Sequence, residues 1–91
     1  MHSKLVPTAY VLLNSDLGSD VTVIKEVKDI LVQEKGITYE VQGVYGVYDI
    51  VLKMIAVDTD NLRSVITNKI RKISKVQSTL TMMVIEEQED T

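Results

Sequence analysis

Apolar and polar positions along this chain follow two rhythms that change at regular points. A short apolar run at 8–14 predicts a strand. From Val23 to Leu31, apolar residues recur at three- and four-residue steps, which predicts a helix. Ser19 or Asp20 is expected to cap its start, and Gly36 is expected to follow its last turn. Strict alternation over 37–44 predicts a second strand with one wet face.

The second half repeats this order of elements. Segment 50–57 is apolar apart from Lys53 and predicts a strand, and the acidic stretch 58–60 opens a second helix. Its apolar stripe, in which Lys69 is expected to extend its ammonium group into solvent, contains Leu62, Val65, Ile66, Lys69, Ile70 and Ile73. Alternation over 76–86 predicts a last strand. The βαββαβ order predicts an α+β, ferredoxin-like fold, with a four-stranded antiparallel sheet and two helices on one face.

Two helices can cover only one face of such a sheet, but the predicted strands are apolar on both faces. The positions concerned are Val11, Leu12, Leu13, Val51, Leu52, Ile55, Val57, Leu80 and Met82. Exposing about six of these side chains would cost roughly 1.5–3 kcal/mol each, which in total rivals the stability of a small domain. We therefore expect a homodimer that buries the open face against an identical sheet, with further association.

Composition limits the class of protein. The 91 residues are 45% apolar and 25% charged, which indicates one domain over 1–91 with a core at about 8–86. Ten basic against thirteen acidic residues give a net charge of −3, which argues against direct nucleic-acid binding. The chain has no cysteine and no apolar stretch that could span a bilayer, so a cytoplasmic location is expected. The acidic run 86–90 is expected to be a solvated strand end or tail.

The segment 44–50 interrupts two predicted strands with polar chemistry. Gly46 permits close backbone approach, and Tyr45, Tyr48 and Asp49 could form one wall of a small pocket that takes an anion on N–H groups and a cation on the carboxylate. Alternatively, Asp49 accepts N–H bonds within its own turn, and the tyrosines are interface aromatics.

No residue set in the folded part provides a convincing nucleophile or acid–base pair, so a non-enzymatic protein without cofactor or metal is expected. The single histidine, His2, lies near the terminus, and the acidic residues at 16–20 and 58–60 are suited to helix capping. A solvated helix surface is expected for the basic cluster of Arg63, Lys69, Arg71, Lys72 and Lys75. Two alternatives stay open: a structural scaffold without a ligand, and a small dimeric α+β barrel enzyme with a deep apolar pocket.

Three segments carry a resemblance to a known family: the turn and strand start at 45–52, the helical stretch 62–66, and the strand 76–81. In their order and spacing they resemble the effector-binding domain of the Lrp/AsnC feast/famine regulators, also called the RAM domain. The resemblance spans about 9–86. Full-length members carry a preceding helix-turn-helix domain, whereas only a short lead at 1–7 precedes the first strand here, so this chain resembles the stand-alone form.

The resemblance implies a ferredoxin-like domain that dimerises through its sheets, forms rings of dimers and binds small amino acids between dimers. It also implies regulation of transcription through protein partners, including full-length Lrp/AsnC regulators. Gly46, Tyr48 and Asp49 match the effector loop of the family, and Thr79 and Thr81 match hydroxyl positions of its last strand. Asp49 is suited to an ammonium group, and N–H groups near Gly46 and the two threonine hydroxyls are suited to a carboxylate. Without the resemblance, the two threonines are typical of a half-buried strand.

Overall fold

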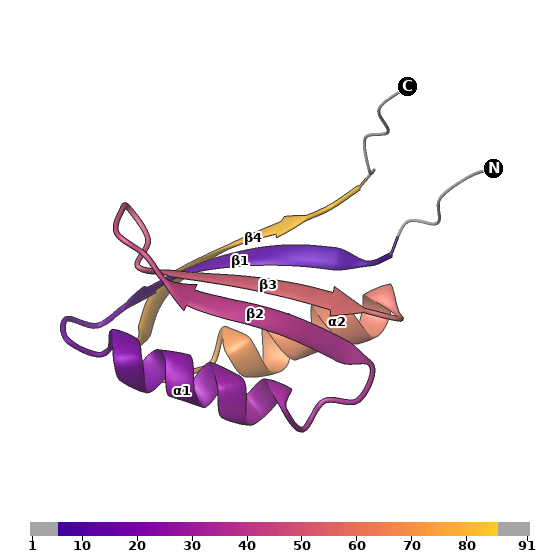
Figure 1. Ribbon diagram of the computed structural model, residues 1–91, viewed down its shortest axis with the longest axis horizontal. Coiled ribbons are helices and arrows are strands. Elements are labelled where there is room, and N and C mark those ends of the chain that lie inside the picture. Colours follow the sequence, from indigo (N-terminus) through magenta and orange to yellow (C-terminus); the bar gives the residue numbers. More distant parts are fainter. Residues whose placement is uncertain (1–5, 86–91) are drawn as a thin grey trace.

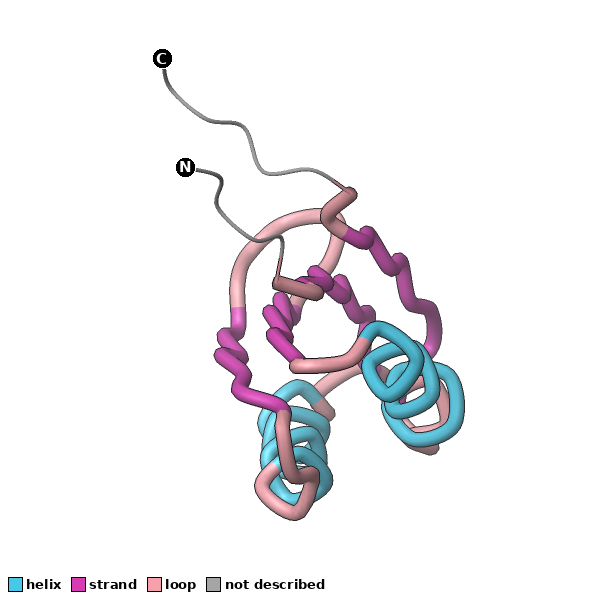
Figure 2. Tube along the Cα trace, turned by 90° about the vertical axis from the view of Figure 1, so that its right-hand side faces the viewer, coloured by secondary structure: helices cyan, strands magenta, loops and turns pink. Residues whose placement is uncertain are grey.

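A computed structural model describes residues 6–85 and contains the elements in the predicted order. The strands and helices are β1 (Thr8–Ser15), α1 (Asp20–Leu31), β2 (Ile37–Gly43), β3 (Ile50–Ala56), α2 (Thr59–Val65), the π-helical turn η1 (Ile66–Ile70) that continues α2, and β4 (Val76–Met83). The sheet order is β2-β3-β1-β4, and all neighbours pair antiparallel. Both helices lie on one side of the sheet (Figures 1 and 2), so the predicted ferredoxin-like α+β fold is confirmed.

The core lies between the helices and the sheet, where the apolar faces of the strands pack against the apolar stripes of the helices. Alternate residues of β1 and β3 point to the helices, and the apolar stripes of α1 and of α2 with η1 point back. The buried side chains include Val11, Leu13, Val23, Val27, Leu31, Ile50, Leu52, Met54, Leu62, Val65, Ile66, Ile70 and Ile73. Lys69 interrupts the second stripe, and its side chain is exposed, as the sequence predicts; its ammonium group also pairs with Glu34, which the sequence did not indicate.

The opposite face of the sheet is apolar along its centre and has no cover within the described chain. Leu12 of β1 lies in register with Val51 of β3 on one side and with Leu80 of β4 on the other. Lys53 is the charged exception on the central strands. It lies directly opposite Tyr10, with its Nζ atom 5.9 Å from the ring centroid, and opposite Glu40 on its other side. The predicted apolar character on both faces is therefore confirmed.

The predicted ends of α1 and of β3 are wrong. Helix α1 ends at Leu31 and not near Gly36, because its apolar stripe stops there and short-range bonds, such as Glu34 N donating to Leu31 O at 3.1 Å, close the last turn. Gly36, with φ of 80°, instead lies in the turn before β2. Strand β3 ends at Ala56, so Val57 belongs to neither face of the sheet.

The last strand also differs from its prediction. Strand β4 ends at Met83, and the prediction of a strand up to 86 overruns it. Val84 still donates its N–H to Thr8 O at 2.9 Å, so one hydrogen bond to β1 lies beyond the end of the strand. The acidic run 86–90 and His2 lie outside the described residues.

The two helices begin differently. Asp58 accepts a hydrogen bond from Asn61 N at 3.0 Å and so caps α2 as predicted, whereas Ser19 precedes α1 without a side-chain cap bond. Asp58→Ala is therefore expected to reduce the free energy of unfolding by about 0.5–2 kcal/mol. Ser19→Ala is the matched control and should change it little. Urea denaturation of both variants measures the difference, and equal losses would contradict the capping role of Asp58.

Candidate functional site

The connection between β2 and β3 projects from the end of the sheet opposite the start of β1 and the end of β4 (Figure 1). Val44 N donates to Asp49 O at 2.9 Å and closes the loop at its base. Beyond that bond, the side chain of Tyr45 is fully exposed and Val47 is 84% exposed. Gly46 has a positive φ of 156° at the tip, and Tyr48 is half-buried. The loop therefore offers backbone and aromatic groups beyond the body of its own domain.

Asp49 fixes this loop to the end of β1. Its half-buried carboxylate accepts one hydrogen bond from Ser15 N at 3.0 Å and one from Ser15 Oγ at 2.5 Å. Asp49 N in turn donates to Leu13 O at 3.2 Å. An ionised carboxylate has about four acceptor positions, so two remain for a further donor. The side chain thus has a clear local partner on the neighbouring strand and is still able to bind a cation.

Thr79 of β4, in register with Leu13, lies toward this end of the sheet, whereas Thr81, in register with Val11, lies near its middle. Thr79 and Ile50 flank Leu13 from opposite sides, so the two backbones are separated by two strand spacings, or about 10 Å. Thr79 is half-buried and Thr81 is exposed, and both lie on the helix-facing side of β4. Within one chain the predicted site residues therefore form two separate groups: Gly46, Tyr48 and Asp49 on the loop, and the threonines on the last strand.

Ser15 is the residue that the sequence analysis missed. The predicted strand 8–14 stops one residue before it, but Ser15 ends β1 next to Asn14, whose Nδ2 donates to Ser78 Oγ at 3.3 Å. Polar side chains thus cross the sheet end from Asp49 through β1 to β4. The available signal was the Asn14-Ser15 pair directly after a buried strand, which places hydroxyl and amide groups where the strands end.

Comparison with known proteins identifies the family. Residues 8–91 match the family model of the Lrp/AsnC ligand binding domain. This chain belongs to the Lrp/AsnC family. An HTH-type transcriptional regulator of Pyrococcus furiosus is 37% identical over 80 residues, which are 88% of this chain and 52% of that protein. The chain therefore spans about half the length of the curated relative that it matches.

Solved structures of the Lrp/AsnC fold agree with this assignment. A hypothetical protein of Pyrococcus horikoshii, PHS023, is 33% identical, with a TM-score of 0.68 over 89% of this chain and 92% of that one. A transcriptional regulator of Neisseria meningitidis, solved in complex with L-Met, has a TM-score of 0.66 over 100% of this chain and 62% of that one. At 12% identity, the latter shows the fold alone. The resemblance inferred from the sequence is confirmed.

The Lrp/AsnC assignment establishes a ligand-binding domain from a family of transcriptional regulators. Residues 6–85 contain no cluster of three or more histidine or acidic side chains that could hold a metal ion. Neither helix in that range combines the length and the apolar composition that crossing a bilayer requires.

Proposed function

We propose that this chain is a non-enzymatic, cytoplasmic amino-acid sensor that oligomerises and modulates transcription through protein partners. The observation that carries the proposal is the match of residues 8–91 to the Lrp/AsnC ligand-binding domain. The L-Met complex of the Neisseria neighbour supports an amino acid as the ligand class, and the HTH-type relative supports a link to transcription. Full-length Lrp/AsnC regulators are the protein partners of choice, since they carry the same domain and a DNA-binding unit.

In this proposal the ammonium group of the amino acid pairs with Asp49, whose carboxylate retains acceptor positions beside the two bonds from Ser15. Backbone N–H groups around Gly46 and the hydroxyls of Thr79 and Thr81 receive the ligand carboxylate, and Tyr48 lines the wall. Within one chain the loop and β4 are separated by about 10 Å. A compact ligand is therefore best held by the loop of one chain and the threonines of another, which makes binding depend on assembly.

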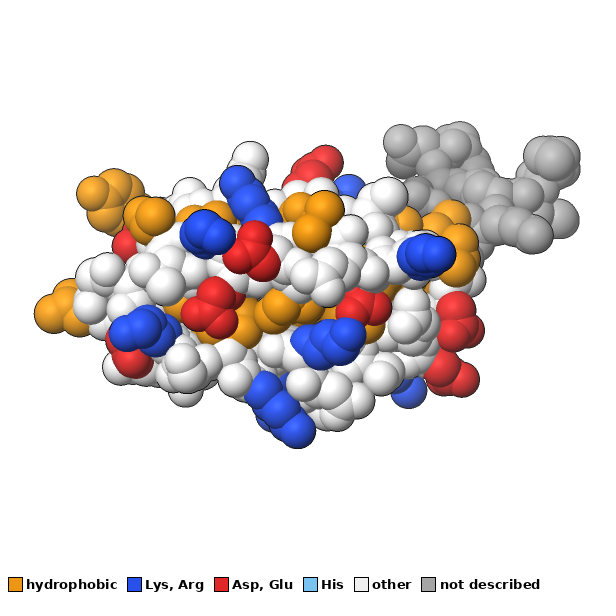
Figure 3. Space-filling model, turned by 90° about the horizontal axis from the view of Figure 1, so that it is seen from below, with side chains coloured by type: hydrophobic (Ala, Val, Ile, Leu, Met, Phe, Trp, Pro, Cys, Tyr) orange, Lys and Arg blue, Asp and Glu red, His pale blue; other side chains and the backbone are white. Residues whose placement is uncertain are grey.

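Two apolar surfaces support that assembly. The open face of the sheet, centred on Leu12, is suited to stacking on the same face of a second chain. A second group of exposed side chains, Leu17, Tyr45 and Val47, lies on the β1–α1 connection and on the β2–β3 loop. Figure 3 shows apolar side chains projecting at the end of the molecule away from the grey residues. Contacts at this end would join dimers into a ring.

A ligand-free scaffold is the second candidate, and the bonds between Ser15 and Asp49 favour it, because they give the carboxylate a structural role of its own. The barrel-enzyme alternative requires a deep apolar pocket between helices and sheet. That space is filled by core side chains such as Val11, Leu52 and Leu62, each with no exposed surface.

A thermal-shift screen of the twenty amino acids, with light scattering on the same samples, tests the sensor. A ligand that binds the folded state raises its stability by mass action, so one or a few amino acids should raise the melting temperature. Asp49→Asn removes the charge but keeps an acceptor for Ser15, and it should weaken binding about tenfold or more. Ser15→Ala is the control, because it removes one bond to the carboxylate and leaves the charge.

The outcomes separate the two candidates. Retained affinity in Asp49→Asn would show that this carboxylate does not bind the ligand. A flat screen together with a large, stable assembly would instead favour the scaffold.

A further inference from the structure

A groove separates β4 from the second helical segment, on the helix side of the sheet. It has a volume of about 300 Å³ and is lined by Arg63, Ile66, Thr67, Arg71, Thr81 and Met83. It exists because the helices cover the central strands and stop short of β4. On the helix-facing side of β1, Val11 is fully buried, whereas its neighbour in register, Thr81, is exposed.

The π-helical turn η1 aligns the two arginines along this groove. An unbroken α-helix turns by about 100° per residue, so eight residues would place Arg71 about 80° around the axis from Arg63. In η1, Arg71 N donates to Ile66 O at 2.9 Å, five residues back, and this wider turn takes up one extra residue. The extra residue reverses about 100° of rotation and returns Arg71 to within roughly 20° of Arg63. Such turns are frequent at functional sites.

Both guanidinium groups have unused donors. The ion pairs within residues 6–85 join Lys25 to Asp29 and Lys69 to Glu34, and neither involves an arginine of the groove. No acidic side chain lines the groove. Asp58, one helical turn and more before Arg63, is engaged in the cap of α2. Positive charge therefore accumulates on one side of the groove, and no acidic side chain of residues 6–85 pairs with it.

We propose that this groove binds a small organic oxyanion, that is, a phosphate or carboxylate group on a compact apolar body. Planar guanidinium groups form paired, charge-assisted hydrogen bonds with such oxygens, and the hydroxyls of Thr67 and Thr81 add neutral donors. Ile66 and Met83 provide the apolar contact surface. The volume is at the lower end of the range for small-molecule sites.

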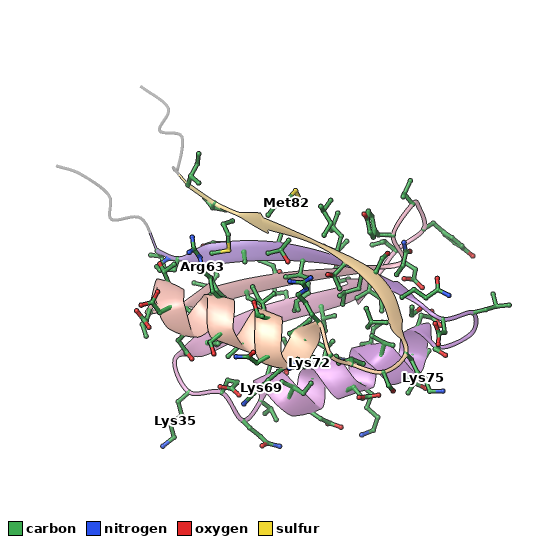
Figure 4. All side chains as sticks on the ribbon, turned by 180° about the vertical axis from the view of Figure 1, so that it is seen from behind. Lys35, Arg63, Lys69, Lys72, Lys75 and Met82 are labelled. Carbon is green, nitrogen blue, oxygen red and sulfur yellow. The ribbon has the colours of Figure 1, made fainter. Side chains whose placement is uncertain are left out.

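This site shares Thr81 with the proposed amino-acid site, but it lies apart from the loop of Asp49 and from the open face of the sheet. Figure 4 shows Arg63 on the helical side of β4, whereas Met82 lies on the other side of that strand. Stacking of two sheets through the open face would therefore leave the groove accessible. The oxyanion site does not rest on the proposed amino-acid sensor, and either can fail without the other.

Titration of the whole chain with phenyl phosphate, inorganic phosphate and benzoate, followed by calorimetry and by amide chemical shifts, tests the site. We expect phenyl phosphate or benzoate to bind more tightly than inorganic phosphate, with shifts that include the amides of Thr67 and Thr81. The preferred probe distinguishes a phosphate from a carboxylate ligand. The double variant Arg63→Gln/Arg71→Gln should weaken binding about tenfold or more.

The matched control is Lys72→Gln/Lys75→Gln, which removes the same charge from the turn that follows η1, outside the groove. It should retain binding, and melting temperatures of both double variants verify that they are folded. Equal losses in the two double variants would show general charge attraction and overturn the site. Absence of binding by all three probes at millimolar concentration would overturn it as well.

Discussion

Leu12→Asp is expected to convert the proposed sheet-to-sheet dimer into monomers. Leu12 lies at the centre of the open face, between Val51 and Leu80 in register, so every face-to-face stacking of two sheets buries it. An aspartate there would be an unpaired charge in an apolar interface, which costs several kcal/mol on each chain. In the isolated chain the same carboxylate reaches water, since this face has no cover within the described residues. The fold should therefore survive.

Size-exclusion chromatography with light scattering over a range of concentrations measures this effect. Val21→Asp is the matched control, because Val21 is 74% exposed on α1 in the helical layer, and this variant should remain assembled. If Leu12→Asp also remained assembled, the open face would not be the interface, and the sheet-to-sheet dimer would have to be abandoned.

Leu52→Ala is expected to lower the free energy of unfolding by about 2–5 kcal/mol, because it removes a fully buried side chain and leaves a cavity in the core. Leu52 occupies the middle of β3, in register with Val11 on one side and Val41 on the other. The total free energy of unfolding of a domain of this size is only about 5–15 kcal/mol. The melting temperature should therefore fall by roughly 8 °C or more.

The neighbouring residue provides the control. Val51→Ala is on the same strand but on the open face, so it should lower the free energy of unfolding much less than Leu52→Ala does. Both substitutions are compared in the Leu12→Asp background, which is expected to be monomeric. Calorimetry or urea denaturation at low protein concentration makes the comparison. Equal losses would mean that the open face is part of a packed core in the monomer.

The sequence predicted the fold well because its information is local. Strand alternation in 37–44 and the helical stripe from Leu62 to Ile73 identify which face each element buries, and burial determines how the elements stack. The end of β4 is harder to predict, because it depends on a partner that is distant in sequence. Met83 is in register with Ala9, close to the residue at which β1 begins.

The residues of the candidate site stay a prediction from the sequence, and the structure adds contacts that the sequence did not indicate. The order of glycine, tyrosine and aspartate at 46–49 indicated a polar loop, and the Lrp/AsnC resemblance indicated its use. The contact between Asp49 and Ser15 joins residues 34 positions apart, which no local pattern can reveal. The sequence pattern also did not indicate η1, in which Arg71 N donates to Ile66 O five residues back.

Lys53 limits which other sheets could stack on the open face. An open face made only of leucine, valine and methionine could stack on many different sheets in many alignments, because apolar contact is not directional. A lysine beside Tyr10 and Glu40 loses its hydration in any stacking that sets it against an apolar side chain, and such mismatches are penalised. In a cell that contains several proteins with this fold, their sheets would compete for the open face of this chain. Lys53 disfavours every competing sheet that lacks a polar or acidic partner for its ammonium group.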